Sequence, residues 1–135
     1  MSGERDLNVL LRTMTPELQD GIFVFCTIPQ DSVVPGAIQP LLLFREREAT
    51  TLVVRREEAD RAGLSGRFAS RLITLTVHSS LEAVGFLAAV TARLATAGIS
   101  VNAVSAYFHD HLLVPVDRAT EALRLLMDMS DAPAG

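Results

Sequence analysis

The stretch that decides the fold runs from Arg71 to Met129, and its first strand meets its first helix in the phrase Val77-His78-Ser79-Ser80-Leu81-Glu82-Ala83-Val84-Gly85. Apolar and polar residues alternate over 73–78, which predicts a strand with one buried face. Apolar residues at helical spacing then predict a helix over 81–97, which ends at Gly98. The stretch therefore starts as a strand followed by a helix.

The remainder of this stretch predicts a hairpin and a second helix. Residues 101–108 and 111–116 are expected to form two strands around His109-Asp110, and Asp117 is expected to cap the final helix. This order of elements is typical of ferredoxin-like α+β folds, which have antiparallel sheets with helices on one face. Such a unit needs a fourth strand, which either Leu7–Arg12 or a strand of the first half could supply.

Each of the two helices has an apolar stripe that predicts its buried face. The stripe of the first helix comprises Val84, Leu87, Ala88, Leu94 and Ala95. The stripe of the final helix comprises Ala119, Leu123, Leu126 and Met127. Phe86 and Val90 lie off the first stripe, which suggests a surface covered by a partner chain, and a homodimer is the economical interpretation.

The first half of the chain predicts a second strand-rich unit. Its expected strands cover 7–12, 22–28, 41–45 and 51–55, with one helical turn at Thr15–Leu18 and a short helix over 57–62. Residues 29–40 contain three prolines and predict a loop. A joint at Ser65-Gly66 divides the chain into an N-terminal half, 1–66, a C-terminal domain, 67–129, and a tail, 130–135. The missing fourth strand predicts that the two halves are interlocked.

Composition narrows the possible functions. The chain has 135 residues, 49% of them apolar, a net charge of −4 and no Trp, which argues against a nucleic-acid binder. No apolar run approaches the roughly 18–20 residues that span a bilayer, so no membrane association is expected. The charged N-terminus does not look like a secretory signal, and the single Cys26 lies in an apolar run. A cytoplasmic protein is therefore expected.

Two phrases, Glu82-Ala83-Val84-Gly85 and Gly98-Ile99-Ser100-Val101, resemble the sequence pattern of ACT domains, small regulatory modules that bind amino acids beside metabolic enzymes. Three others, Gly21-Ile22-Phe23-Val24-Phe25-Cys26, Phe44-Arg45-Glu46 and Tyr107-Phe108-His109-Asp110-His111, extend the resemblance to a bacterial family of stand-alone tandem-ACT proteins. The C-terminal half is also similar to the ACT modules of aspartate kinases and of CASTOR arginine sensors. The resemblance implies two interlocked ACT units that sense an amino acid.

The same resemblance implies a ligand site where the first strand–helix loop meets a neighbouring ACT unit. The residues that it implies for this site are His78, Ser79, Ser80, Glu82, Ala83, Val84, Gly85 and Asn102. Free amides at a helix N-terminus favour a carboxylate, and Gly85 lets a ligand approach closely. In the alternative interpretation, Ser79 and Glu82 form a capping box and satisfy two helix amides themselves.

The sequence offers little support for catalysis or for a metal. Zinc needs three or four convergent ligands, and the only histidine besides His109 and His111 is His78. If His109-Asp110 is the tip of the hairpin, the two histidines leave opposite strands, so no metal or cofactor is expected. There is also no catalytic triad motif, phosphate loop or dinucleotide-binding motif.

The leading hypothesis is a non-catalytic regulatory module that binds an amino acid or a similar small carboxylate metabolite at an ACT–ACT junction, and that acts on a regulated protein partner. One alternative is a protein–protein adaptor without a small-molecule ligand. Another is a weak enzyme that uses His78 or the His109–Asp110 pair.

Overall fold

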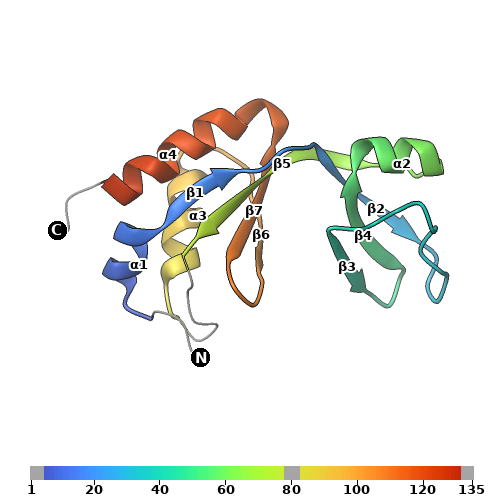
Figure 1. Ribbon diagram of the computed structural model, residues 1–135, viewed down its shortest axis with the longest axis horizontal. Coiled ribbons are helices and arrows are strands. Elements are labelled where there is room, and N and C mark those ends of the chain that lie inside the picture. Colours follow the sequence, from blue (N-terminus) through green and yellow to red (C-terminus); the bar gives the residue numbers. More distant parts are fainter. Residues whose placement is uncertain (1–4, 78–82, 132–135) are drawn as a thin grey trace. The chain divides into compact units, whose positions relative to one another are not determined.

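The computed structural model describes residues 5–77 and 83–131. Its contacts divide the chain into two compact units (Figure 1). One unit, here called the middle unit, comprises Gly21–Ser70, and the other, the terminal unit, comprises Met1–Asp20 together with Arg71–Gly135. The contacts thus group the N-terminal segment with the C-terminal residues, whereas the sequence suggested two consecutive halves.

The middle unit is a four-stranded antiparallel sheet with one helix. Its strands are β2 (Phe23–Ile28), β3 (Leu42–Arg45), β4 (Thr50–Arg55) and the first part of β5 (Arg67–Thr76), in the order β3-β4-β2-β5. The strands expected over 22–28, 41–45 and 51–55 are confirmed with small shifts at their ends. The expected short helix is also confirmed: α2 (Arg56–Ala62) ends at Gly63, which adopts the left-handed conformation at φ +69°.

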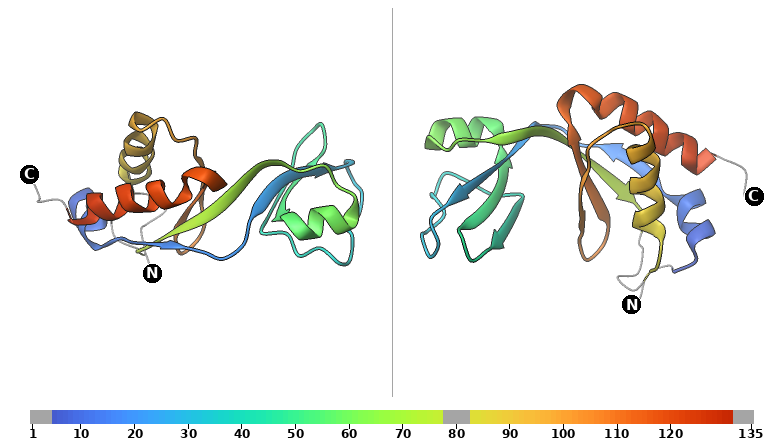
Figure 2. Two further views of the ribbon diagram at one scale, coloured as in Figure 1. Left: turned by 90° about the horizontal axis from the view of Figure 1, so that it is seen from above. Right: turned by 180° about the vertical axis from the view of Figure 1, so that it is seen from behind.

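Helix α2 packs on β2 and β4 (Figure 2). Its Ala59 belongs to one buried cluster with Val24, Cys26, Leu52 and Val54. The Cys26 thiol is packed in this core, and its burial raises its pKa. A ferredoxin-like unit has a helix between its first two strands, but residues 29–41 contain none. Ile38 from this segment fills part of the core instead.

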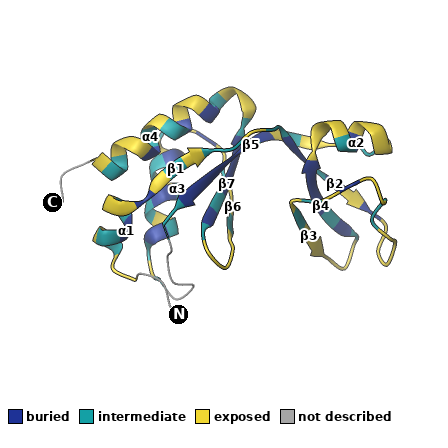
Figure 3. Ribbon diagram, viewed as in Figure 1, coloured by how far each residue is buried: buried dark blue, intermediate teal, exposed yellow. Residues whose placement is uncertain are grey.

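In the terminal unit, helices and strands from both ends of the chain form one core. Its elements are α1 (Leu7–Thr13), β1 (Thr15–Leu18), the second part of β5, α3 (Phe86–Thr96), β6 (Asn102–Ser105), β7 (Asp110–Pro115), a short 3-10 helix η1 (Val116–Arg118) and α4 (Ala119–Asp131). The strand order is β1-β5-β7-β6. Helices α1, α3 and α4 contribute buried side chains to a core shared with β5 and β7 (Figure 3). Both units are thus ferredoxin-like, which confirms the predicted α+β class.

The prediction of a strand at Leu7–Arg12 is wrong, because this segment forms helix α1. The side chain of Asp6 caps the helix by accepting hydrogen bonds from the amides of Asn8 and Val9 at 2.9 and 3.2 Å. Leu10 is fully buried on the inner face of this helix. A short apolar run alone does not distinguish a buried helix from a strand.

The prediction of a helical turn at Thr15–Leu18 is also wrong, because these residues form β1. This strand pairs antiparallel with β5, from Thr15 opposite Thr76 to Leu18 opposite Ile73. Pro16 can be accommodated because β1 is an edge strand of its unit, where a missing N–H is tolerated. The fourth strand of the C-terminal domain is therefore β1.

Helix α3 begins later than predicted, and its buried face differs from the predicted stripe. It begins at Phe86, and residues 83–85 form a loop. Its buried residues are Phe86, Val90 and Leu94, whereas Val84 is 84% exposed. The inference of a partner surface on Phe86 and Val90 is therefore wrong, because both side chains lie in the core of their own unit.

The prediction for the final helix is partly wrong. The buried residues of α4 are Ala119, Ala122 and Leu126, whereas Met127 is about half exposed. Asp117 lies in η1, so it precedes the α-helix and does not occupy the expected capping position.

The two units contain the same hairpin, although their sequences show no close repeat. In the middle unit Leu42 pairs with Val53 and Arg45 with Thr50. In the terminal unit Asn102 pairs with Leu113 and Ser105 with Asp110. Each hairpin therefore has a turn of the same length, 46–49 or 106–109, and a helix follows each one. Asp110 begins β7, so the turn is centred on Tyr107-Phe108, two residues before the expected His109-Asp110.

None of the helices in the described part of the chain is long and apolar enough to cross a membrane.

The buried face of α3 predicts how two substitutions differ in stability. Phe86→Ala should lower the free energy of unfolding by about 3–5 kcal/mol, because it leaves a cavity in the core. Val84→Ala should change it by less than about 0.5 kcal/mol, because this side chain faces solvent. Urea denaturation of both variants measures the difference. A large loss of stability for Val84→Ala with a small loss for Phe86→Ala would contradict the observed buried face and support the stripe predicted from the sequence.

Candidate functional site

The loop that leads into α3 contains the described part of the predicted ligand wall. Ala83 is partly buried against the core, Val84 is exposed, and Gly85 is the N-cap residue of the helix. His78, Ser79, Ser80 and Glu82 lie outside the described residues, as does the capping box that Ser79 and Glu82 would form. Among the described residues, no side chain caps α3. The first-turn amides of this helix thus have no side-chain acceptor in that part of the chain.

Gly85 is required by its backbone conformation. Its φ is +88°, a region that side chains with a Cβ rarely adopt. Among the described residues, the nearest atom to a Cβ placed there is Cδ2 of Leu7 at 3.8 Å, an ordinary contact. The glycine therefore allows a sharp entry into α3.

Asn102 lies away from this loop. It begins β6 and pairs with Leu113, at the end of the hairpin farthest from the turn over 106–109. The turn itself adjoins the end of β5, because Nδ1 of His109 lies 3.3 Å from the carbonyl oxygen of Val77. The structure therefore brings His109 to the strand that leads into the loop, and it does not bring Asn102 there.

His109 was missed as a neighbour of the site because residue patterns do not indicate where the hairpin lies relative to β5. Its ring nitrogen donates to the Val77 carbonyl, which can only accept. The one available signal was the polar pair His109-Asp110, and polar residues are common at most hairpin turns.

A line of polar side chains crosses the sheet of the terminal unit beside the two histidines. Gln19 donates from Nε2 to the hydroxyl of Thr74 at 3.2 Å, and that hydroxyl lies 3.0 Å from Nδ1 of His111. Burial lowers the pKa of His111, the neighbouring His109 lowers it further, and Asp110 opposes the shift. Neutral His111 is thus favoured, and its unprotonated Nδ1 can accept from Thr74.

The two histidines lie closer together than expected, with ring centroids 6.5 Å apart. Asp110 accepts a hydrogen bond from the Ser105 hydroxyl, so its carboxylate helps to fix the hairpin. Within residues 5–77 and 83–131, no three His, Cys, Asp or Glu side chains converge as a metal site would require. The described residues therefore provide no support for a metal centre in this hairpin.

Two family models match the two halves of the chain, and solved structures resemble most of its length. One ACT-domain model matches residues 2–71, and a second matches residues 67–128. A crystal structure of a Vibrio cholerae protein of unknown function, described as a possible transport protein, is 43% identical, with a TM-score of 0.82. The match covers 92% of this chain and 95% of that protein. No curated protein matches the chain.

Two distant neighbours belong to aspartate kinases. The ligand-free regulatory subunit from Thermus thermophilus is 13% identical, with a TM-score of 0.60, over 88% of this chain and 98% of that one. A putative C-terminal regulatory domain from Porphyromonas gingivalis is 11% identical, with a TM-score of 0.62, over 90% and 99%. At these identities the likeness shows the fold alone. Together with the two family matches and the two ferredoxin-like units, it leads to one conclusion: the chain belongs to the ACT-domain family and contains two ACT domains in tandem.

Proposed function

We propose that this protein is a non-catalytic regulatory module that binds an amino acid or a similar small carboxylate metabolite at the start of α3. The observation that carries this proposal is the entry to the helix, where Gly85 turns the chain at φ +88° and no described side chain caps the first turn. The amides of Phe86, Leu87 and Ala88 lack helical acceptors, and the helix dipole favours an anion beside them.

The loop also offers an apolar contact next to these amides. Val84 is 84% exposed, whereas Ala83 is partly buried beside it. A carboxylate held by the helix amides would bring the rest of the ligand near the exposed valine. Asn102 is not included in this site, because it lies at the other end of its hairpin.

In ACT domains, a second ACT unit commonly completes the ligand site, and we propose that a second copy of this chain supplies it. A homodimer would then cover Val84, which a lone chain leaves in solvent. We further propose that the dimer acts in the cytoplasm on a protein partner, with no nucleic-acid or membrane ligand. The net charge of −4 supports the exclusion of nucleic acid.

A protein–protein adaptor is the second candidate, and one observation favours it. Tyr107 and Phe108, in the turn between β6 and β7, are 64% and 62% exposed and stack edge to face with centroids 4.9 Å apart. Exposed aromatic pairs of this kind are enriched in protein interfaces. An adaptor would use this turn and would have no response to metabolites.

A thermal-shift screen against the twenty amino acids and related carboxylates tests the ligand proposal. A ligand present at 100 times its Kd should stabilise the protein by about 2.7 kcal/mol, which raises the Tm by several degrees. The absence of a shift with every compound would contradict the proposal and favour the adaptor.

Two glycine substitutions locate the site. In Gly85→Asn the fold should survive, because Asn tolerates the left-handed region, but its side chain would lie beside the amides that hold the carboxylate. The ligand-induced shift should therefore disappear. Gly98→Asn, beyond the other end of α3, is the matched control: φ there is +75°, and no described atom lies within 4 Å of the added Cβ. It should retain the full shift. Equal responses of the two variants would place the ligand elsewhere.

A further inference from the structure

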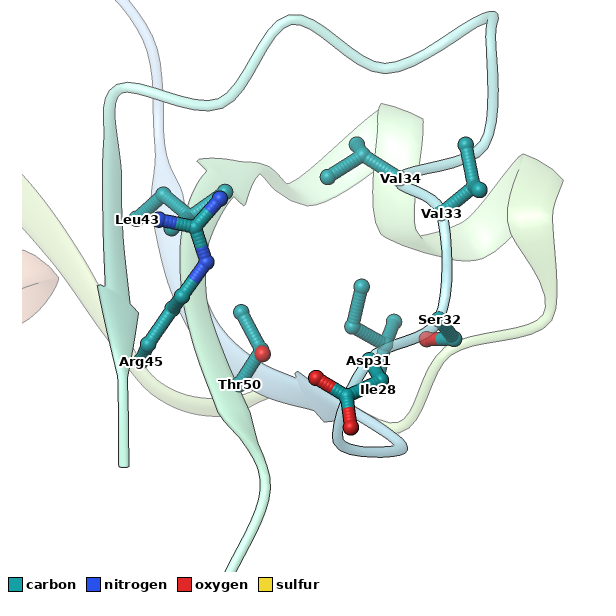
Figure 4. Close-up of a pocket in the computed structure, with 8 residues that line it drawn as sticks. All are labelled: Ile28, Asp31, Ser32, Val33, Val34, Leu43, Arg45 and Thr50. Atoms are coloured by element: carbon teal, nitrogen blue, oxygen red, sulfur yellow. The ribbon is translucent and has the colours of Figure 1, made fainter. Parts of the chain in front are cut away.

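The middle unit contains a pocket between the loop after β2 and the edge strand β3 (Figure 4). Its volume is about 360 Å³, which is within the range of small-molecule sites. Asp31 and Arg45 are the charged residues that line it, and Ile28, Val34, Leu43 and Thr50 contribute to its walls. All of these residues belong to one compact unit, so the pocket does not depend on the terminal unit.

The pocket lies beside the segment that occupies the place of the missing helix. After β2, the chain turns at Pro29, whose carbonyl oxygen accepts from the amide of Ser32 at 3.1 Å and from its hydroxyl at 2.7 Å. Asp31, inside this turn, has a φ of +64°. Aspartate tolerates this conformation better than most residues. The turn thus places the backbone of Asp31 at one side of the pocket.

The two charged side chains lie on opposite sides of the pocket, Asp31 on the loop and Arg45 on β3 (Figure 4). Neither side chain has a hydrogen bond or an ion pair with any other described residue. A guanidinium group favours a carboxylate, with which it can form two parallel hydrogen bonds. The Asp31 carboxylate favours an ammonium group. The pair is therefore complementary to a molecule that carries both charges.

Apolar side chains and a hydroxyl lie between the two charges. Ile28 is buried at the end of β2, and Val34 and Leu43 contribute aliphatic wall from the loop and from β3. Thr50 is nearly buried and stands opposite Arg45 in the hairpin. These walls fit a small aliphatic group better than a second charge, since a buried charge without a partner is costly.

We propose that this pocket is a second ligand site, which binds a zwitterionic α-amino acid with a small aliphatic side chain. Arg45 pairs with the ligand carboxylate, Asp31 pairs with the ligand ammonium, and the aliphatic group contacts Ile28, Val34 and Leu43. A simple monocarboxylate would lack a partner for Asp31, and a simple amine would lack one for Arg45. The site goes beyond the proposed α3 site and does not depend on it.

Nuclear magnetic resonance of the full-length ¹⁵N-labelled protein tests the proposal with L-alanine, L-valine and L-leucine. At least one of them should cause saturable shifts of the amides of residues 31–34 and 43–50. Two analogues of L-valine each lack one charge, L-valinamide the carboxylate and 3-methylbutanoate the ammonium. Both should bind at least roughly tenfold more weakly than L-valine, as measured by the shifts of these amides.

Substitutions test the two charged residues. Arg45→Gln and Asp31→Asn should each weaken binding at these amides by roughly tenfold or more. Asn also tolerates the φ of residue 31, so the turn should persist. Arg47→Gln and Glu48→Gln, in the turn of the same hairpin, make the same charge changes outside the pocket and should leave the affinity unchanged.

Three results would overturn this second site. The first is that none of the three amino acids causes a saturable shift over residues 31–50. The second is that the two analogues bind as well as L-valine, and the third is that the pocket variants and the control variants have equal affinities. Shifts confined to residues 83–88 would support the α3 site while overturning this one. Shifts confined to the pocket residues would support this second site and contradict the α3 site.

Discussion

The pairing of β1 with β5 is the constraint on which the terminal ACT domain depends. Four residue pairs join the strands, and the amide of Gln19 extends the ladder by donating to the Leu72 carbonyl at 2.8 Å. The pairing also places α1 in the core, where Leu10 and Met14 are buried. Ser130, near the end of α4, donates to the carbonyl oxygens of Arg12 and Met14. Residues from both ends of the chain are thereby joined in one domain.

The two ACT domains share strand β5, but they differ in how they would present groups to a ligand. The first part of β5 pairs with β2 and its second part with β1, with a bulge near Phe68, whose φ is +56°. In the terminal unit, the strand leads toward a helix whose first turn lacks a described side-chain cap. The middle unit has no helix over 29–41 and instead places around a pocket two charged side chains without a partner among the described residues. Under the two proposals, units of the same topology would therefore use different groups to bind a small charged metabolite.

The sequence predicted the elements that have a clear period and failed where local signals were ambiguous. Strands β2, β3 and β4 of the middle unit and both hairpins followed from alternation and turn residues, and the ferredoxin-like class followed from their order. The first part of β5, from Arg67, was not predicted. The helix Leu7–Thr13 was predicted as a strand and the strand Thr15–Leu18 as a helical turn. The cap at Asp6 and the proline at position 16 are each compatible with more than one local structure, and the tertiary contacts decide between them.

For the proposed site at the start of α3, the family resemblance indicated the loop that contains Gly85 and also Asn102, which the structure places at the far end of its hairpin. The pocket around Asp31 and Arg45 was missed entirely. It depends on how an aperiodic, proline-rich segment lies against an edge strand, and no pattern in the residues encodes that placement.

Native-state amide hydrogen exchange of the full-length protein tests most directly whether the N-terminal segment is part of the C-terminal ACT domain. The amide of Gln19 and the hydrogen-bonded amides of β1 should open with the same free energy as those of Ile73–Thr76 in β5, because one cooperative unit contains both strands. Rapid exchange of Gln19 and β1, with β5 still strongly protected, would contradict this and would show that the C-terminal domain is stable without the strand from the N-terminus.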